Sequence, residues 1–279
     1  MKKYIILAVL VLCVSLLFHS DNSEEKPKSD RPVLRIGSEC NYVPNSWEEN
    51  KPSPFNHPVS NNKGFYVDGY DIQIAKLVAG KLGYDLEVRK IAWNDLLPSL
   101  DKGEIDAIFS SMLDTEERKK LATFSEPYEI NKTEYAIIVD SVGSYITAKT
   151  LKDFSGARIV GERGTKLDDV IEQIPGVIHM RPLDSVKEVI DSVLNNKADG
   201  AVIEVDTGRF YELSNKNLTL VKFSEGDGFK LGFNGVCAGV RRGNTDLVRR
   251  INDAIFDINH GERRKIMEAV NSRMMTNLH

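Results

Sequence analysis

An alternation of strand-like and helix-like segments runs through the chain twice, and it constrains the fold more than any other feature. Short apolar runs typical of buried strands are each followed by a segment whose apolar residues recur at helical spacing. Such an order favours a mostly parallel sheet covered by helices. We therefore expect an α/β fold with two lobes, the second inserted between parts of the first. The strands expected in the first lobe are 33–39, 85–93 and 105–111, and those expected in the second are 157–161, 199–204 and 218–223.

Local signals mark several boundaries in the first lobe. Asp71 is expected to cap the helix that ends before Gly83, and Asn94 is expected to cap a second, shorter helix. The segment 41–65 carries four prolines and several asparagines, which predicts a long loop. Loops of this length are uncommon and are often functional.

The composition is that of an ordinary soluble globular protein, with 279 residues, 41% of them apolar and 28% charged. A chain of this length supports one large domain or two lobes of roughly 100 residues each. The expected boundaries are 32–127 for lobe 1, 128–222 for lobe 2 and 223–279 for a return to lobe 1. With 37 basic and 41 acidic residues, scattered rather than blocked, no nucleic-acid partner is expected.

The N-terminus differs from the rest of the chain. Lys2 and Lys3 precede an apolar run over 4–18, after which the chain is polar and contains proline. This pattern predicts an export signal over 1–20 and a flexible spacer over 21–31. The apolar run is shorter than the about 20 residues of a membrane span, and whether it is removed or stays as a membrane anchor is open. We expect the protein to be exported, to the periplasm or the outer face of the cytoplasmic membrane.

The cysteines leave two questions open. Cys13 lies within the apolar run, but Leu12 before it is not the small residue that lipid attachment favours. Cys40 and Cys237 could pair in an exported chain, but the sequence does not show that they meet. There is no CxxC pair and there are only five histidines, so neither a metal site nor a cofactor is expected.

The stretch SSMLDTEERKK, residues 110–120, combines features of an anion receptor. Asp114 or Thr115 is placed to cap a helix, with acids in its first turn as the macrodipole favours. Arg118 is a cation at that positive end, and it has two interpretations. It pairs with Glu116, Glu117 or a distant carboxylate, or it joins free N–H groups and the two serines in binding a carboxylate.

Other polar and aromatic residues fall where the expected strands end, and ligands bind at such ends in open α/β sheets. Each has an ordinary interpretation, because such aromatics are often core residues and such carboxylates are often simply solvated. Together they would line a cleft that suits a zwitterion, with a cation for its carboxylate, an acid for its ammonium and aromatic walls for its side chain. They are Glu39, Ser110, Ser111, the turn 161–165 and Glu204, with Tyr42 and Trp93 at strand-to-helix junctions.

Two stretches carry a resemblance to a known family. YVDGYDIQIAKLVAGKLG and the later WNDLLPSLDKGEIDAIFSSMLDTEERKKLATFSEPY resemble the polar amino-acid-binding proteins of ABC importers, the family-3 extracellular solute-binding group. The likeness runs from about Val33 to the last helix. It implies a two-lobed periplasmic-binding-protein-like fold of type II, whose ligand cleft lies between lobes joined by two crossing segments near 125–132 and 220–224.

The resemblance also implies how the ligand's carboxylate is bound. Arg118 would grip the α-carboxylate, with Ser111 and the backbone of Leu113 beside it. The N–H of Lys166, which Thr165 precedes, would complete that site from the second lobe.

The same resemblance assigns the rest of the ligand. The α-ammonium would meet the Glu204 carboxylate and the carbonyl of Ser110. Tyr42 and Trp93 fall on the two aromatics that sandwich the ligand side chain.

Two further acids bear on which amino acid is bound. Glu39 falls where the family's binders of basic amino acids carry an acid, and Glu162 would add a second negative group. A cationic side chain between aromatic faces, with a carboxylate at its tip, is favourable, so lysine or arginine is the expected ligand. Arg163, next to Glu162, could instead neutralise that glutamate. The loop 44–63 is longer than in most relatives, and its effect on specificity is open.

The resemblance thus implies an extracytoplasmic receptor, expected as a monomer, that closes around a free amino acid and delivers it to the membrane permease of an ABC transporter. It implies no enzyme activity. Two alternatives remain: a cyclohexadienyl-dehydratase-like enzyme on the same fold, with Glu39 or Glu204 as general acid, and a sensory amino-acid-binding module. The ammonium site at Glu204 separates the receptor from the dehydratase, whose substrate has no amine.

Overall fold

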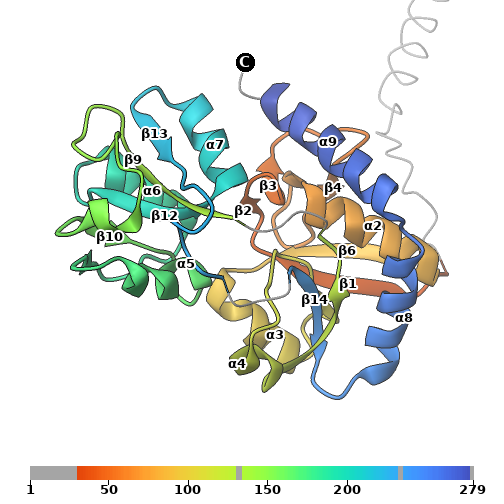
Figure 1. The fold of residues 1–279 in the computed structure, drawn as a ribbon. Coiled ribbons are helices and arrows are strands. Elements are labelled where there is room, and N and C mark those ends of the chain that lie inside the picture. Colours follow the sequence, from red (N-terminus) through yellow and green to blue (C-terminus); the bar gives the residue numbers. More distant parts are fainter. Residues whose placement is uncertain (1–29, 130–133, 232–234, 277–279) are drawn as a thin grey trace, which may run out of the picture. The chain divides into compact units, whose positions relative to one another are not determined.

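The computed structural model describes residues 30–129, 134–231 and 235–276, and from Pro32 onward these belong to one compact unit (Figure 1). Two five-stranded sheets form its frame. In the first sheet the order is β6-β1-β7-β14-β8, with β6 and β7 parallel to β1, and with β14 antiparallel to β7 and β8. These strands are β1 (Val33–Ser38), β6 (Asp85–Lys90), β7 (Ala107–Ile108), β8 (Ala122–Pro127) and β14 (Cys237–Arg241).

Helices from both ends of the chain cover this first sheet. The buried face of one of them, with Ile72, Ala75 and Val78 at helical spacing, packs with Leu34 and Ile36 of β1 in one apolar core. The helices that precede or follow its strands are α2 (Tyr70–Leu82), α3 (Leu96–Asp101), α4 (Glu116–Lys119), α8 (Thr245–Phe256) and α9 (His260–Thr276), with a 3₁₀ turn at Trp93–Asp95.

The second sheet has the order β11-β10-β12-β9-β13. Alternate residues of its strands point to opposite faces and join two separate apolar cores. Its strands are β9 (Tyr135–Asp140), β10 (Arg158–Val160), β11 (Ile178–His179), β12 (Gly200–Glu204) and β13 (Leu218–Val221). The helices that accompany them are α5 (Lys166–Asp169), α6 (Val186–Leu194) and α7 (Val205–Ser214), with 3₁₀ turns at Leu151–Phe154 and Val170–Gln173.

The chain crosses between the sheets twice. It leaves the first sheet after Pro127, joins the second at Tyr135, leaves it after Val221 and returns at Cys237. β14 then inserts between β7 and β8, which confirms the predicted fold class of two α/β lobes, one inserted in the other. The predicted crossing segments overlap these connections, partly outside the described residues, and the exact lobe boundaries stay predictions.

The segment 41–65 was predicted to be a loop, and that prediction is wrong. It contributes to a small antiparallel sheet of order β2-β3-β5-β4. The prolines and asparagines do mark turns, but the strands between them are too short for an alternating pattern to reveal them. These strands are β2 (Asn41–Tyr42), β3 (Ser46–Glu49), β4 (His57–Pro58) and β5 (Tyr66–Asp68).

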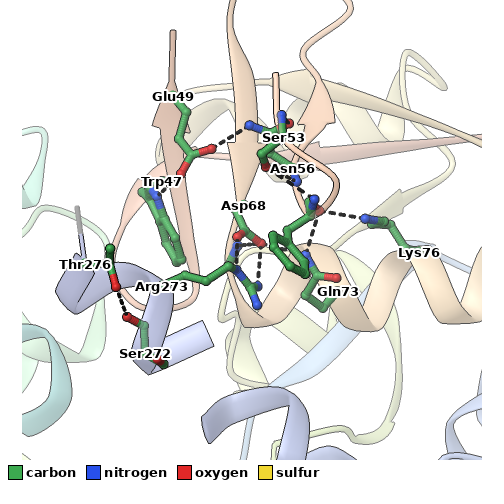
Figure 2. A network of polar contacts seen from close by, with 12 residues as sticks. Trp47, Glu49, Ser53, Asn56, Asp68, Gln73, Lys76, Ser272, Arg273 and Thr276 are labelled. Carbon is green, nitrogen blue, oxygen red and sulfur yellow. Dashed lines mark hydrogen bonds and ion pairs between the residues drawn. The ribbon is translucent and has the colours of Figure 1, made fainter. Parts of the chain in front are cut away.

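A polar network ties the small sheet to α9 and α2 (Figure 2). Asp68, whose side chain is only 2% exposed, accepts from Arg273 Nε at 2.6 Å and from its Nη2 at 3.0 Å. The same guanidinium lies over the Phe55 ring, 4.5 Å from the ring centroid, and Gln73 also donates to Asp68. Because a buried carboxylate is costly without such partners, this network fixes the small sheet to the first lobe.

Two predicted helix caps are wrong. α2 begins after Gly69, whose φ of 132° and close approach to the Asn45 carbonyl leave no room for a side chain, since a Cβ would lie 2.2 Å from that oxygen. Asp71 lies in the first turn of α2 and is buried. Asn94 lies inside the 3₁₀ turn, and the residue before that turn is Ala92.

The predicted export signal over 1–20, Cys13 within it, and nearly all of the spacer 21–31 lie outside the described residues. In the described part of the chain, no helix combines the length and the apolar character needed to span a bilayer.

Candidate ligand-binding site

A cavity with about 410 Å³ of empty space lies at the ends of strands from both five-stranded sheets. All eleven residues predicted from the sequence line it. They are Glu39, Tyr42, Trp93, Ser110, Ser111, Leu113, Arg118, Glu162, Thr165, Lys166 and Glu204. Two residues that the sequence reasoning missed, Tyr135 and Leu167, line it as well. The structure therefore brings the whole predicted set together.

Arg118 lies on α4, which is a single turn. Thr115 caps this turn, its hydroxyl accepting from the Arg118 N–H at 3.3 Å, so the alternative cap Asp114 is not used. A helix this short places Arg118 in its last turn as well as its first. The conflict with the macrodipole that the sequence suggested therefore does not arise.

Backbone carbonyls and an aromatic ring hold the guanidinium of Arg118. Nη1 donates to the Leu113 carbonyl at 3.0 Å, and Nη2 donates to the Gly164 carbonyl at 3.1 Å. The group lies over the Trp93 ring, 5.0 Å from its centroid. Burial lowers the pKa of Arg118, yet an arginine stays protonated in proteins, so the cavity holds a fixed positive charge at this end.

Glu116 forms an ion pair with Lys119 at 3.1 Å, and Glu117 acts on Arg118 only through its charge. Asp114 forms an ion pair with Lys119 at 3.0 Å, and Asp169 forms one with Lys166 at 2.7 Å. Over 30–129, 134–231 and 235–276, no carboxylate forms an ion pair with Arg118. The interpretation in which a nearby acid neutralises this arginine is therefore wrong for the described residues.

The turn at Gly164 joins the two sides of the cavity. Its carbonyl accepts from Trp93 Nε1 at 3.1 Å as well as from Arg118. Gly164 has a φ of +72°, and a Cβ there would lie 2.7 Å from Asn94 Oδ1. Both the backbone conformation and the close approach therefore require glycine at this position.

Thr165 and Lys166 bring the start of α5 to the cavity. The Thr165 hydroxyl accepts from the Leu167 N–H at 3.2 Å and donates to the Glu162 carbonyl at 2.7 Å. The Lys166 ammonium is compensated by Asp169. Lys166 therefore adds no uncompensated charge to the site, and its predicted backbone contact with a ligand stays a prediction.

Ser110 and Ser111 follow β7, and a buried acid positions the second of them. The Ser110 hydroxyl accepts from the Glu39 N–H at 3.1 Å. Ser111 has a φ of 50°, in the left-handed region, and donates its hydroxyl to Asp71 at 3.0 Å. Asp71 also accepts from the Tyr128 hydroxyl at 2.7 Å, and burial raises its pKa to about 7. Because its hydroxyl is engaged, the predicted contact of Ser111 with a ligand carboxylate stays a prediction.

Glu39 and Glu162 are the most buried charged residues of the cavity, at 5% and 3% exposure. Asn41 donates to Glu39 at 3.0 Å. Arg163 forms an ion pair with Asp184, so the alternative in which it neutralises Glu162 is wrong. Burial raises the pKa of Glu39, and it raises the pKa of Glu162 well above its usual range, with the charge of Glu39 adding to that shift.

Glu204 ends β12 and is the third acid of the cavity. Protein surrounds its side chain, although the cavity leaves part of its surface accessible. Burial raises the pKa of Glu204 to about 7, and a hydrogen bond with Tyr42 opposes this shift. Burial, followed by the charge of Glu204, also raises the pKa of Tyr42 and Tyr135 well above their usual range, so both phenols are neutral.

Tyr42 belongs to the small sheet, yet it packs in a core of the second lobe with Val160 and Ile203. Next to it, Thr207 of α7 donates to the Val43 carbonyl at 2.6 Å. For Tyr42, the core interpretation and the cavity-wall interpretation are therefore both correct.

Of the two cavity residues that were not predicted, Tyr135 and Leu167, only the first carries a signal in the sequence. Tyr135 is an aromatic residue at the first position of β9, directly after a crossing between the lobes. An aromatic at such a position is the signal by which the sequence could have indicated it. Leu167 is an ordinary apolar helix residue beside Lys166, and nothing in the sequence distinguishes it from a core leucine.

The cysteines that the structure describes take no part in this cavity. Cys40 and Cys237, whose pairing the sequence left open, are free and buried, and burial raises the pKa of each thiol to about 12. Among the described residues, no three His, Cys, Asp or Glu side chains are grouped so as to hold a metal ion.

Known proteins share this sequence pattern. The chain is 26% identical over 220 residues to the arginine-binding extracellular protein ArtP of Bacillus subtilis, which covers 78% of this chain and 79% of ArtP. It is 25% identical over 249 residues to the L-cystine-binding protein TcyJ of Escherichia coli, which covers 89% of this chain and 86% of TcyJ.

Solved structures share its fold. An ancestral arginine-binding protein bound to arginine has a TM-score of 0.68 at 27% identity, covering 86% of this chain and 98% of that one. The substrate-binding protein of an amino acid ABC transporter has a TM-score of 0.71 at 24% identity, covering 85% and 98%. The model of the bacterial extracellular solute-binding proteins, family 3, matches residues 34–270. Because this match spans most of the sequence, the chain belongs to that family.

Proposed function

We propose that this protein is an extracytoplasmic receptor that binds a free basic amino acid, lysine or arginine, and delivers it to the permease of an ABC transporter. One observation carries the proposal. A single cavity holds one fixed cation, Arg118, for which the described residues offer no carboxylate ion-pair partner, together with three acids: Glu39 and Glu162, which are buried, and Glu204, which is partly accessible. These charges are complementary to a ligand with one carboxylate and two cationic groups.

The ligand's head group would bind between Arg118 and Glu204. The guanidinium keeps donors for a carboxylate beside the two it gives to carbonyls, since it carries five N–H groups in a planar fork. The N–H groups of Leu113 and Lys166 would add to this site. The α-ammonium would pair with Glu204 and the Ser110 carbonyl, and so remove the charge that burial makes unfavourable.

The ligand's side chain would extend between Tyr42 and Trp93 toward Glu39. A cation is attracted to aromatic faces and forms charge-assisted hydrogen bonds with carboxylates. Among the relatives, ArtP is an arginine-binding protein, and the ancestral protein of similar fold was solved with arginine bound. Both support a basic ligand here. The likeness to a cystine-binding protein is the reason to include cystine among the ligands tested below.

Capture would use closure of the two lobes about the crossing segments near 125–132 and 220–224, with lobe boundaries at 127/128 and 222/223. We infer that the receptor works as a monomer outside the cytoplasm and without a nucleic-acid partner, and that residues 1–20 direct its export. Family membership supports export, because the family consists of extracellular solute-binding proteins.

The proposal is tested by thermal unfolding of the mature protein with each of the twenty amino acids, ornithine and cystine. A ligand that binds only the folded state raises the midpoint by mass action. Shifts confined to lysine, arginine and ornithine are expected. Equal shifts with glutamine and other neutral amino acids would keep the receptor and overturn the basic ligand, and no shift with any of them would overturn the receptor.

Prephenate in the same experiment tests the dehydratase alternative. Its two carboxylates would face three acids in the cavity, and it has no ammonium to compensate Glu204. We therefore expect no shift with prephenate, and a shift with prephenate alone would favour the enzyme.

A further inference from the structure

Two buried acids of the cavity come from opposite sheets, and their carboxyl groups lie within hydrogen-bonding reach of one another. Glu39 directly follows β1 in the first sheet, and Glu162 follows β10 in the second. The Val186 N–H donates to the Glu162 carboxylate, yet Glu162 Oε1, although buried, has no hydrogen-bond partner among the described residues. A side chain 97% buried, with an acceptor that no donor of the described residues fills, requires a proton on one of the two carboxyls or a donor from a ligand.

Among the residues that the structure describes, no cation compensates both acids. Lys90 is the cation that acts on Glu39, and it is already bound to Glu48. Arg163, on the other side, is bound to Asp184.

The remaining titratable groups around the pair add no positive charge. Glu204 is a third acid and acts on Glu162 through its own negative charge. Tyr42 and Tyr211, whose pKa values burial raises, are neutral. Lys166 is already paired with Asp169. Two full negative charges on Glu39 and Glu162 would therefore have almost no positive charge to balance them.

We propose that Glu39 and Glu162 share one proton while no ligand is bound, and that the cationic end of the ligand side chain displaces this proton. This rests on the proposed function and deepens it, because Glu162 becomes a specificity-determining residue. Two carboxyls this deeply buried beside each other are not expected both to ionise without a counter-charge. A guanidinium would give both acids N–H donors, including the one that Glu162 Oε1 lacks, and the proton would leave to solvent.

The displaced proton makes affinity for a basic ligand depend on pH. Below the raised pKa of the pair the ligand must expel a proton, so its affinity falls as pH falls, by up to about tenfold per pH unit for each proton released. Above that pKa the affinity is level. Glu204 also titrates, with a pKa of about 7, but every α-amino acid would engage it equally.

Calorimetric titration in buffers of different ionisation enthalpy counts the protons released. Citrulline is the control ligand, because it has the shape of arginine with a neutral urea at its tip, so subtraction removes the contribution of Glu204. At about pH 6 we expect arginine to release up to about one proton more than citrulline. Glu162→Gln keeps the acceptor for Val186 and should abolish this excess, whereas the matched exposed variant Glu268→Gln should keep it.

The outcomes are distinguishable. Equal proton release for arginine and citrulline in the wild type, or an unchanged excess in Glu162→Gln, would overturn the shared proton and leave the receptor intact. Where citrulline binds too weakly for calorimetry, arginine release is compared between wild type and Glu162→Gln, and equal values overturn the proposal. Binding of neither ligand to the wild type would overturn the proposed function itself.

Discussion

The two ends of the cavity hold charge in different ways. At one end Arg118 is held by carbonyls and a tryptophan ring, and it cannot lose its proton. At the other end Glu39 and Glu162 are enclosed almost completely, and they can avoid their charge by protonation. The cationic end is therefore ready for an anion at every physiological pH, whereas the acidic end accepts a cation only after giving up a proton. Selectivity for a basic side chain can thus respond to pH at the acidic end, whereas titration of Glu204 changes the affinity for every α-amino acid alike.

The largest expected effect comes from removing Arg118, the cation at one end of the cavity. Arg118→Ala should lower the affinity for every amino acid by about 100-fold or more, because it removes charge-assisted hydrogen bonds to a buried carboxylate. Calorimetry with arginine and with glutamine measures it. Arg118→Lys is the matched control and should keep part of the affinity, since it retains the charge without the planar fork. Binding within a few-fold of wild type in the alanine variant would show that the carboxylate binds elsewhere.

The next effect concerns Glu204 and appears in stability. Its folded pKa of about 7 lies above its unfolded value, so its contribution to stability is fully present below the unfolded pKa and is lost as pH rises through about 7. Glu204→Gln should remove this loss. The difference in unfolding free energy between the unliganded variant and the wild type should therefore be about 1–3 kcal/mol more favourable to the variant at pH 8 than at pH 5. Denaturant unfolding at both pH values is the measurement. A difference between variant and wild type that does not grow with pH would contradict the raised pKa.

A smaller effect on affinity is expected from changing Glu39 at the acidic end of the cavity. Glu39→Gln should lower the affinity for arginine by about tenfold, because one charge-assisted hydrogen bond becomes neutral, and should leave the affinity for glutamine nearly unchanged. The ratio of the two affinities, measured by titration at one pH, separates side-chain recognition from head-group recognition. Equal losses for both ligands would place Glu39 at the head group.

The smallest effect comes from a compensated group outside the cavity. Burial lowers the pKa of His179, but its hydrogen bonds to Asp168 at 2.9 Å and to Glu172 at 2.7 Å outweigh this and raise it. Its contribution to stability is fully present below the unfolded pKa and lost as pH rises through the higher folded value. His179→Gln should cost less than about 1 kcal/mol at pH 5.5, as for an exposed ion pair, and nothing at pH 9. A ligand affinity that changed with this variant would show that α5 transmits the change to the cavity.

Much of the frame and of the site was predictable because both depend on regular patterns. Apolar runs of the length of β1 and β12 predict where strands end, and residues at or just after those ends, Glu204 and Glu39, were therefore expected at the cavity. The order of motifs along the chain then assigned the remaining site residues, including Arg118.

Other features could not be predicted because they depend on contacts between distant residues. The strands between Asn41 and Asp68 are too short to show a period and are stabilised by α9, which lies far along the chain. Asp71 looks like a helix cap in the sequence, but Ser111 and Tyr128, which hold it in the structure, follow it by about forty residues or more. Among the residues described, Glu162 has no cationic neighbour to neutralise it because Arg163 forms an ion pair with Asp184, and no local sequence pattern predicts that pairing.

The position of β14 inside the first sheet has a consequence for how the chain matures. β8, the edge strand, pairs only with β14 in that sheet, and β14 is made after the entire second lobe. A growing chain therefore cannot finish its first lobe until about residue 241 has been synthesised, although the second lobe draws all its strands from one continuous stretch. We expect the second lobe to be the earlier of the two to fold, and the first lobe to stay incompletely folded until synthesis is nearly over.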